Sequence, residues 1–160
     1  MRKMSLRIRF IVEAGIIAAL YFALTVAVAP ISYGQLQIRV SEALCVLPFF
    51  TAAAIPGLFI GCLLANILSF LGIFDIVFGS LATLIAAIIT YKLKYKWLLP
   101  LPSVVVNAFV VGALLYYLAK LPFLISVLYV GFGQAIACYA LGMPLFFLLN
   151  KHKVRLFRKI

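Results

Sequence analysis

Residues 11–29 read IVEAGIIAALYFALTVAVA, and this run decides the fold class. Four basic residues precede it: Arg2, Lys3, Arg7 and Arg9. A basic start, an apolar run and the small residues Ala27-Val28-Ala29 are typical of a cleaved secretory signal. However, the run is longer than the usual apolar core of 7 to 15 residues, Pro30 follows the potential cleavage site, and more apolar runs come later. We therefore predict that residues 11–29 stay in the protein as a first transmembrane helix.

The composition excludes an ordinary soluble domain. Of 160 residues, 68% are hydrophobic and only 11% are charged, which leaves too little polar surface for a water-soluble fold of this size. The net charge of +11 would suggest a nucleic-acid partner in a soluble protein, but here the basic residues lie just outside apolar stretches and indicate membrane topology. We expect a single all-α membrane domain covering residues 1–160, in contact with lipid and not with nucleic acid.

The lengths of the apolar runs predict six transmembrane helices, since about 20 residues cross a hydrocarbon core of about 30 Å. The expected spans are residues 11–29, 41–55, 56–71, 75–93, 102–119 and 122–149. The second and third are short and meet at Ile55-Pro56-Gly57, where proline can open a helix but not continue one. A re-entrant hairpin is the alternative for this pair, and either arrangement puts both termini on one side.

The basic residues predict which side that is. All but two of the 14 Lys and Arg residues fall on the side of the termini, the exceptions being Arg39 and Lys120. Cytoplasmic loops carry such an excess of positive charge. Both termini and the loop at residues 92–96 are therefore expected in the cytoplasm.

The few polar residues of the spans converge on the outer half of this topology. Arg39, Glu42 and Asp75 fall at external helix ends, while Asn66 and Gln134 fall nearer the middle of their spans. A charge within the bilayer costs at least about 2.5 to 3.5 kcal/mol, so such groups usually line a pathway or pair with one another. We predict a binding site there; the alternative is an ion pair of Arg39 with Glu42 or Asp75 at the lipid surface.

Residues 35–41, QLQIRVS, alternate polar and apolar side chains, which is the period of extended chain. With Ser32-Tyr33-Gly34 as a turn before it, this segment predicts an extended external loop between the first two helices that folds over the site as a lid. A hairpin lying on the membrane surface is the alternative.

Two helices carry small residues at every fourth position, a pattern that lets another helix approach closely. The stripes are Gly15, Ala19, Ala23 and Ala27 in the first span, and Gly57, Gly61 and Ala65 in the third. Such stripes more commonly serve packing within one protein, but a chain with two of them has a second stripe with which to contact a partner protein. Glu13, four residues after Arg9, is expected to form a local helix pair with it.

Motifs for catalysis, ATP binding or metal binding are missing from the sequence. There is no phosphate-binding G-x-x-x-x-G-K-[ST] loop, and His152 is the only histidine. The cysteines Cys45, Cys62 and Cys138 form no metal-ligand pattern. We expect no enzymatic activity, no cofactor and no metal, because catalysis would have to rest on Glu42 and Asp75 alone.

Several motifs together resemble the queuosine-precursor transporter family, QueT. They are APISYG at 29–34, RVSEAL at 39–44 leading into LPFF at 47–50, AIPGLFIGC at 54–62, DIVFGSLAT at 75–83, PSVVVN at 102–107, and Cys138-Tyr139 with Gly142. The resemblance covers nearly the whole chain after its basic start. It implies a prokaryotic, six-helix substrate-binding S component of an energy-coupling factor (ECF) transporter, which captures a vitamin-like compound outside the cell. Such a subunit docks on a separate membrane coupling subunit driven by two ATPases, and the family's expected ligands are 7-deazaguanine precursors of queuosine.

A guanine-like ring fits the polar residues found above. It presents two adjacent N–H donors, which Glu42 or Asp75 can accept, and a carbonyl oxygen suited to Arg39, Asn66 or Gln134. The flat ring also needs stacking partners. The candidates for this role are Tyr33, Phe74, Phe78 and Tyr129. The stripe from Gly15 to Ala27 is the expected docking face for the coupling subunit.

Two other functions fit the same observations. An S component for a different vitamin would share the fold and differ only in the outer cavity. A self-assembling membrane pore or scaffold would form homo-oligomers and bind no ligand.

Overall fold

The computed structural model describes residues 5–32, 39–69 and 71–156, and within these ranges the chain is helical with no strand. The elements, in chain order, are α1 (Leu6–Ala27), α2 (Ala29–Ser32), the 3-10 helix η1 (Val40–Phe49), α3 (Ala54–Asn66), the π-helical turn η2 (Asp75–Gly79), α4 (Ser80–Lys92), the short 3-10 helix η3 (Lys96–Leu98), α5 (Leu101–Ala119), α6 (Phe123–Ala135), the π-helical segment η4 (Ile136–Leu141) and α7 (Gly142–Leu156).

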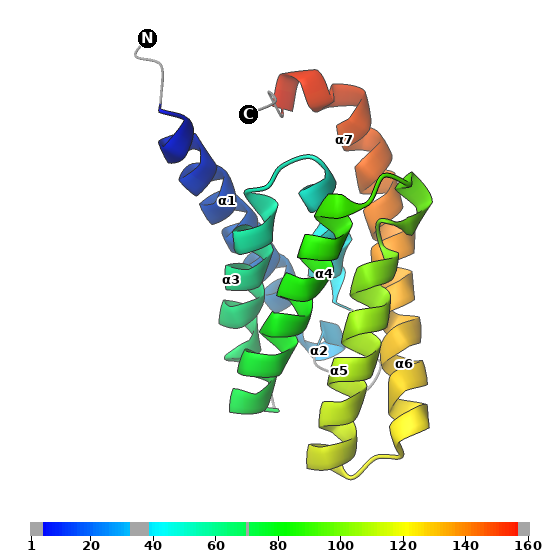
Figure 1. Ribbon diagram of the computed structural model, residues 1–160. Helices are drawn as coiled ribbons and strands as arrows, with labels where there is room; N and C mark the ends of the chain where they lie inside the picture. The colour runs from blue at the N-terminus through cyan, green and yellow to red at the C-terminus, as the bar shows by residue number, and fades with distance from the viewer. Residues whose placement is uncertain (1–4, 33–38, 70, 157–160) are drawn as a thin grey trace.

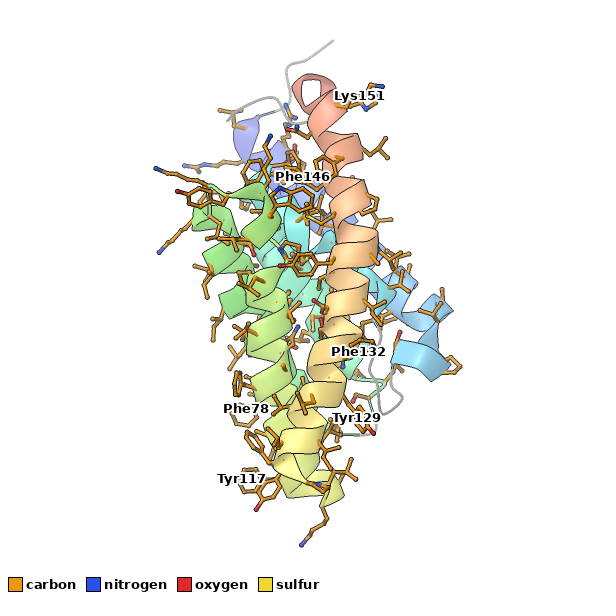
Figure 2. The ribbon with its side chains drawn as sticks, turned by 90° about the vertical axis from the view of Figure 1, so that its right-hand side faces the viewer. Phe78, Tyr117, Tyr129, Phe132, Phe146 and Lys151 are labelled. Atoms are coloured by element: carbon orange, nitrogen blue, oxygen red, sulfur yellow. The ribbon has the colours of Figure 1, made fainter. Side chains whose placement is uncertain are left out.

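These elements form an elongated bundle (Figure 1). The beginning of α1 and the end of α7 lie at the same end of it, and the α5–α6 connection lies at the opposite end. Figure 2 shows Lys151 near the first of these ends and Tyr117 near the second. In the middle, η1 contacts α1, α3, α4, α7 and η4, and its residues from Ser41 to Pro48 are all buried. The most central element of the bundle is therefore also its least regular helix.

Four helical segments in the described ranges are long and apolar enough to cross a membrane: Leu6–Ala27, Asp75–Lys92, Lys96–Ala119 and Phe123–His152. The helices Val40–Phe49 and Ala54–Asn66 are apolar but shorter, at the places where the sequence predicted two short spans. A total of six spans therefore stays a prediction. The outer surface is strongly apolar, with Ile11, Leu124 and Phe132 more than half exposed, as expected of a surface that faces lipid.

Several predicted boundaries were wrong. Helix α1 begins at Leu6 rather than at residue 11. The predicted span 41–55 is a 3-10 helix that ends at Phe49, and Pro56 is the third residue of α3 rather than its opening residue. Proline is tolerated there because the first N–H groups of a helix have no intrahelical partner to lose.

The predicted extended loop is wrong at its two ends. Ser32 ends the short helix α2, and Val40 and Ser41 belong to η1. Among the described residues of this predicted loop, Arg39 alone has an extended backbone, with φ −91° and ψ 107°. The remainder of the predicted turn and lid, including Tyr33, lies outside the described residues.

The small-residue stripe of α3 serves internal packing. A Cβ atom at Gly57 would lie 2.8 Å from the carbonyl oxygen of Ala14, and one at Gly61 would lie 2.7 Å from Cβ of Tyr21. Since real Cβ atoms do not approach so closely, only glycine lets α1 and α3 pack at this distance. The contact fixes α1, and with it Tyr21, against the bundle.

Candidate functional site

Five of the residues predicted to bind substrate are buried inside the bundle. They are Arg39, Glu42, Asn66, Asp75 and Gln134, and none is more than 4% exposed. They come from the start of η1, the last residue of α3, η2 and α6. Segments far apart in the sequence thus contribute to one polar core in a protein whose outer surface is apolar.

Arg39 joins two of these elements. Its Nη1 donates to Oδ1 of Asn66 at 2.9 Å, and its Nη2 donates to Oδ2 of Asp75 at 3.0 Å. Asn66 in turn donates through Nδ2 to the backbone oxygen of Asp75 at 2.8 Å. The ion pair is buried on both sides, with 4% and 0% of the two side chains exposed. The pair proposed as an alternative therefore exists with Asp75, but inside the bundle rather than at the lipid surface.

The second carboxylate oxygen of Asp75 has no hydrogen-bond partner among the described residues, although it is buried. It faces Gly79, where a Cβ atom would overlap it, so glycine at this position leaves room for the carboxylate. The hydroxyl of Ser80, the next residue, is likewise buried and has no partner within the described part of the chain. Both groups belong to the π-helical turn or its junction with α4, and π-helical turns occur frequently at functional sites.

Glu42 lies at the centre of a second set of contacts. The hydroxyl of Tyr21 donates to its Oε1, while Ser103 Oγ and Asn107 Nδ2 donate to its Oε2 at 3.2 Å and 3.5 Å. Both oxygens of Glu42 therefore have hydrogen-bond partners on neighbouring helices. Gln134 is linked to Glu42 through Cys138, whose Sγ lies 3.7 Å from Gln134 Oε1 and 3.6 Å from the backbone oxygen of Glu42.

The prediction from sequence missed Tyr21, Ser103 and Asn107 as members of this core. A weak signal for the last two was present, because residues four apart lie on one face of a helix, and Ser103 and Asn107 have this spacing in an otherwise apolar segment. Tyr21 and Thr25 have the same spacing, and Thr25 bonds to Ser41 Oγ at 2.7 Å.

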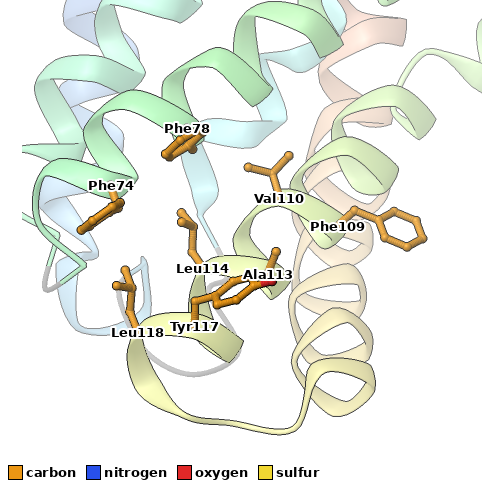
Figure 3. A pocket seen from close by; sticks show the side chains of 8 residues that line it. All are labelled: Phe74, Phe78, Phe109, Val110, Ala113, Leu114, Tyr117 and Leu118. Atoms are coloured by element: carbon orange, nitrogen blue, oxygen red, sulfur yellow. The ribbon is translucent and has the colours of Figure 1, made fainter.

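The aromatic residues predicted to stack on a ring lie elsewhere. Phe78 is 49% exposed and Tyr129 is 51% exposed, both on the outside of the bundle (Figure 2). Phe74 and Phe78 line an apolar groove of about 480 Å³ together with residues of α5, including Phe109 and Tyr117 (Figure 3). Ring stacking by Phe78 and Tyr129 stays a prediction, and Tyr33 lies outside the described residues.

The small-residue stripe of α1 faces outward. Gly15, Ala19, Ala23 and Ala27 are all exposed, and a Cβ atom at Gly15 would have no neighbour within 4 Å. The buried face of α1 is formed by other residues, among them Ala18 and Tyr21. The expected local pair is confirmed, with Arg9 Nε 2.8 Å from Glu13 Oε1.

Comparison with known proteins gives two matches. The sequence model of a family described as QueT transporter matches residues 11–151. A segment of the chain is 44% identical over 77 residues to the queuosine precursor transporter QueT of Lactococcus lactis subsp. cremoris (strain MG1363). The aligned segment covers 47% of this chain and 45% of that relative, so the match extends over less than half of either protein. No solved structure matches.

Proposed function

Because this chain belongs to the QueT transporter family, we propose that it is the substrate-capturing membrane subunit for uptake of a queuosine precursor of the 7-deazaguanine type. The observation that carries the proposal is the buried polar core around Arg39, Glu42 and Asp75 in an apolar, multi-pass membrane protein. Burying three ionisable groups within a bundle is costly, and such groups commonly mark a substrate pathway.

Glu42 accepts the donor edge of the ring. The ring N1–H and the neighbouring amino group lie side by side, which suits the two oxygens of one carboxylate. Among the described residues, Oε2 of Glu42 accepts from Ser103 at 3.2 Å and from Asn107 at 3.5 Å. Long hydrogen bonds are the least costly to exchange, so the ring displaces these two donors while Tyr21 keeps its bond to Oε1. Arg39, Asn66 or Gln134 donates to the ring carbonyl.

The sequence has no phosphate-binding loop, so transport driven by ATP needs partner ATPases. In the proposed arrangement both termini lie in the cytoplasm, and the ligand enters from the opposite side of the membrane. The outward stripe Gly15, Ala19, Ala23 and Ala27 docks on a membrane coupling subunit, and two ATPases of an ECF module drive release inside.

Calorimetric titration of the purified protein with a panel of 7-deazaguanines and unrelated vitamins tests the proposal. We expect binding of the deazaguanines alone, and at least about tenfold weaker binding by Glu42→Gln and Asp75→Asn, since hydrogen bonds to charged groups contribute about 1.5 to 3 kcal/mol. Glu13→Gln is the matched control, because Glu13 pairs with Arg9 outside the polar core. Unchanged affinity in both core variants would exclude the carboxylates from the site. Homo-oligomers that bind no ligand would support a pore or scaffold instead.

A further inference from the structure

The apolar groove of about 480 Å³ follows α5 near the end of the bundle opposite the termini (Figures 1 and 3). Every side chain that lines it is apolar or aromatic. Its residues on α5 run from Phe109 to Leu118, which at a rise of 1.5 Å per residue is about 14 Å along the helix axis. This part of α5 belongs to a segment long and apolar enough to cross a membrane. A groove that runs along such a helix and is lined in this way suits a lipid acyl chain, which packs by van der Waals contact.

The opposite wall of the groove is formed by Phe74 and Phe78 (Figure 3). Each of these side chains is about half exposed, whereas Asp75 between them in the chain is buried. One side of this turn therefore holds the ion pair with Arg39, and its other side faces the groove. An occupant of the groove would pack against the outside of the turn that carries Asp75.

One end of the groove lies where α5 reaches the membrane surface. Lys120 directly follows α5 and falls between the candidate spans that contain α5 and α6. The rings of Tyr116 and Tyr117 meet edge to face at 5.1 Å, and tyrosine is enriched at the level of the lipid headgroups. Lys120 comes two residues after Leu118, so its long side chain can reach the level at which the headgroup of a lipid in the groove would lie.

No acidic side chain of this protein is left to pair with Lys120, which is exposed. The chain has three acidic residues, all within the described ranges. Glu42 and Asp75 are buried in the polar core. Glu13 pairs with Arg9 near the start of α1, toward the other end of the bundle. An anion for Lys120 must therefore come from outside the chain.

The backbone at Lys120 is unusual for a lysine. Its φ is 57°, in the left-handed region, and no other non-glycine residue of the described ranges has a positive φ. The helix ends here with the Leu121 N–H bonded to the Leu115 oxygen at 3.4 Å, an ending in which glycine is the usual residue. The chain therefore carries a positive charge at a position that the backbone favours for glycine. At a membrane surface, a lysine ammonium group binds the phosphate of an anionic lipid.

We propose that this groove binds an anionic phospholipid. One acyl chain lies along α5 between Leu114 and Phe78, and the phosphate pairs with the ammonium group of Lys120. This lipid site lies outside the polar core, so it goes beyond the proposed function and does not depend on it.

Quenching by brominated lipids locates the occupant. The reporter is Tyr117→Trp in a Trp97→Phe background, which makes the groove tryptophan the only one in the chain. It is reconstituted in dioleoylphosphatidylcholine vesicles that contain either brominated phosphatidylglycerol or brominated phosphatidylcholine with the same acyl chains. We expect roughly fivefold tighter binding of the phosphatidylglycerol, the effect of about one basic residue near a charged membrane surface. Phe132→Trp in the same background is the control, because Phe132 is exposed on α6 and does not line the groove, and it should show equal binding of the two lipids.

Two substitutions of Lys120 test the recognition of charge. Lys120→Arg keeps the positive charge and should keep the preference for phosphatidylglycerol. Lys120→Gly removes the charge and relaxes the backbone at φ 57°, so the protein in detergent should melt at the wild-type temperature or above while the preference falls to about one. A preference that survives Lys120→Gly would overturn the proposal, as would equal binding of the two lipids by the parent reporter.

A second copy of this chain could cover the groove instead, and the same measurements separate this case. Weak quenching of Tyr117→Trp by both lipids, beside strong quenching of Phe132→Trp, would show that protein covers the groove and would overturn the lipid site. Cross-linking in the same vesicles would then identify the second copy. Ligand titration of the polar core is a separate measurement, so loss of the lipid site would leave the proposed function standing.

Discussion

The hydroxyl of Tyr21 donates a hydrogen bond to Oε1 of Glu42, and this contact ties α1 to the start of η1 in the middle of the bundle. Tyr21 is 1% exposed, whereas Ala19 and Ala23 on the same helix face outward. One face of α1 therefore touches the polar core while another is available to a partner. Movement of Glu42 on ligand binding would reach α1 through this bond, which lies beside the Thr25–Ser41 bond that also joins the two elements.

Tyr21→Phe tests that contact, because it removes the hydroxyl and keeps the buried ring. Glu42 would lose a hydrogen bond of about 1.5 to 3 kcal/mol, so we expect a lower melting temperature and roughly tenfold weaker ligand binding. Thermal unfolding in detergent and calorimetry measure the two effects. Tyr139→Phe is the control, since its hydroxyl donates to the Trp97 backbone at an exposed position. Wild-type behaviour of Tyr21→Phe would show that the bond contributes little.

The two members of the buried ion pair should respond unequally to neutralisation. Asp75→Asn leaves Arg39 with its bond to Asn66 and with Glu42 still nearby. Arg39→Gln leaves two carboxylates without a cation, and breaking a buried pair in this way costs about 3 to 5 kcal/mol. We expect Arg39→Gln to lower the melting temperature far more than Asp75→Asn, and the double variant to recover part of the loss. Equal losses from the two single variants would show that Arg39 is no more important to the core than Asp75.

The close packing of α1 on α3 predicts a contrast between two glycines. In Gly61→Ala the new Cβ would lie 2.7 Å from Cβ of Tyr21 and 2.8 Å from the Ala18 oxygen, so the helices must separate. Overpacking of this kind costs about 1 to 3 kcal/mol, and it would also displace Tyr21 from Glu42. The new Cβ in Gly15→Ala meets nothing within 4 Å, so this variant should keep the melting temperature or raise it slightly, because alanine is the better helix former. If the two variants melted alike, the stripe of α3 would not be an internal packing face.

The grouping of the charged residues could be predicted from sequence because ionisable residues are scarce in this chain and costly in a membrane. Isolated burial of each charge would be costly, so Arg39, Glu42 and Asp75 were expected to lie close to one another. Tyr21 and Ser103 could not be predicted in the same way, since a hydroxyl on an apolar helix is as compatible with packing or solvent as with a site. Their roles depend on which helix faces which, and that is set by contacts between distant segments such as Gly61 and Tyr21.

The wrongly predicted element boundaries have physical causes in the backbone. The alternating pattern up to Ser41 predicted extended chain, but the Glu42 N–H bonds to the Arg39 carbonyl at 3.0 Å and closes the first turn of η1. The predicted helix 41–55 is interrupted because Pro48 has no N–H to donate, and the chain turns at Thr51, whose Oγ1 accepts from Ala53 N at 3.2 Å. The packing of η1 against the surrounding helices, which buries Ser41 to Pro48, therefore outweighs the local preference that the sequence pattern indicates.

The outward stripe of α1 leads to a prediction that separates transport from binding. Ala23→Leu places a bulky side chain on the exposed face of α1, so ligand affinity of the purified protein should stay at the wild-type value. Docking on a coupling subunit needs close helix approach, so uptake of ligand by cells should fall to background. Ala140→Leu is the matched control, because Ala140 is exposed on another helical segment, and its uptake should remain normal. Normal uptake by Ala23→Leu, or equal loss by Ala140→Leu, would show that this stripe is not the docking face.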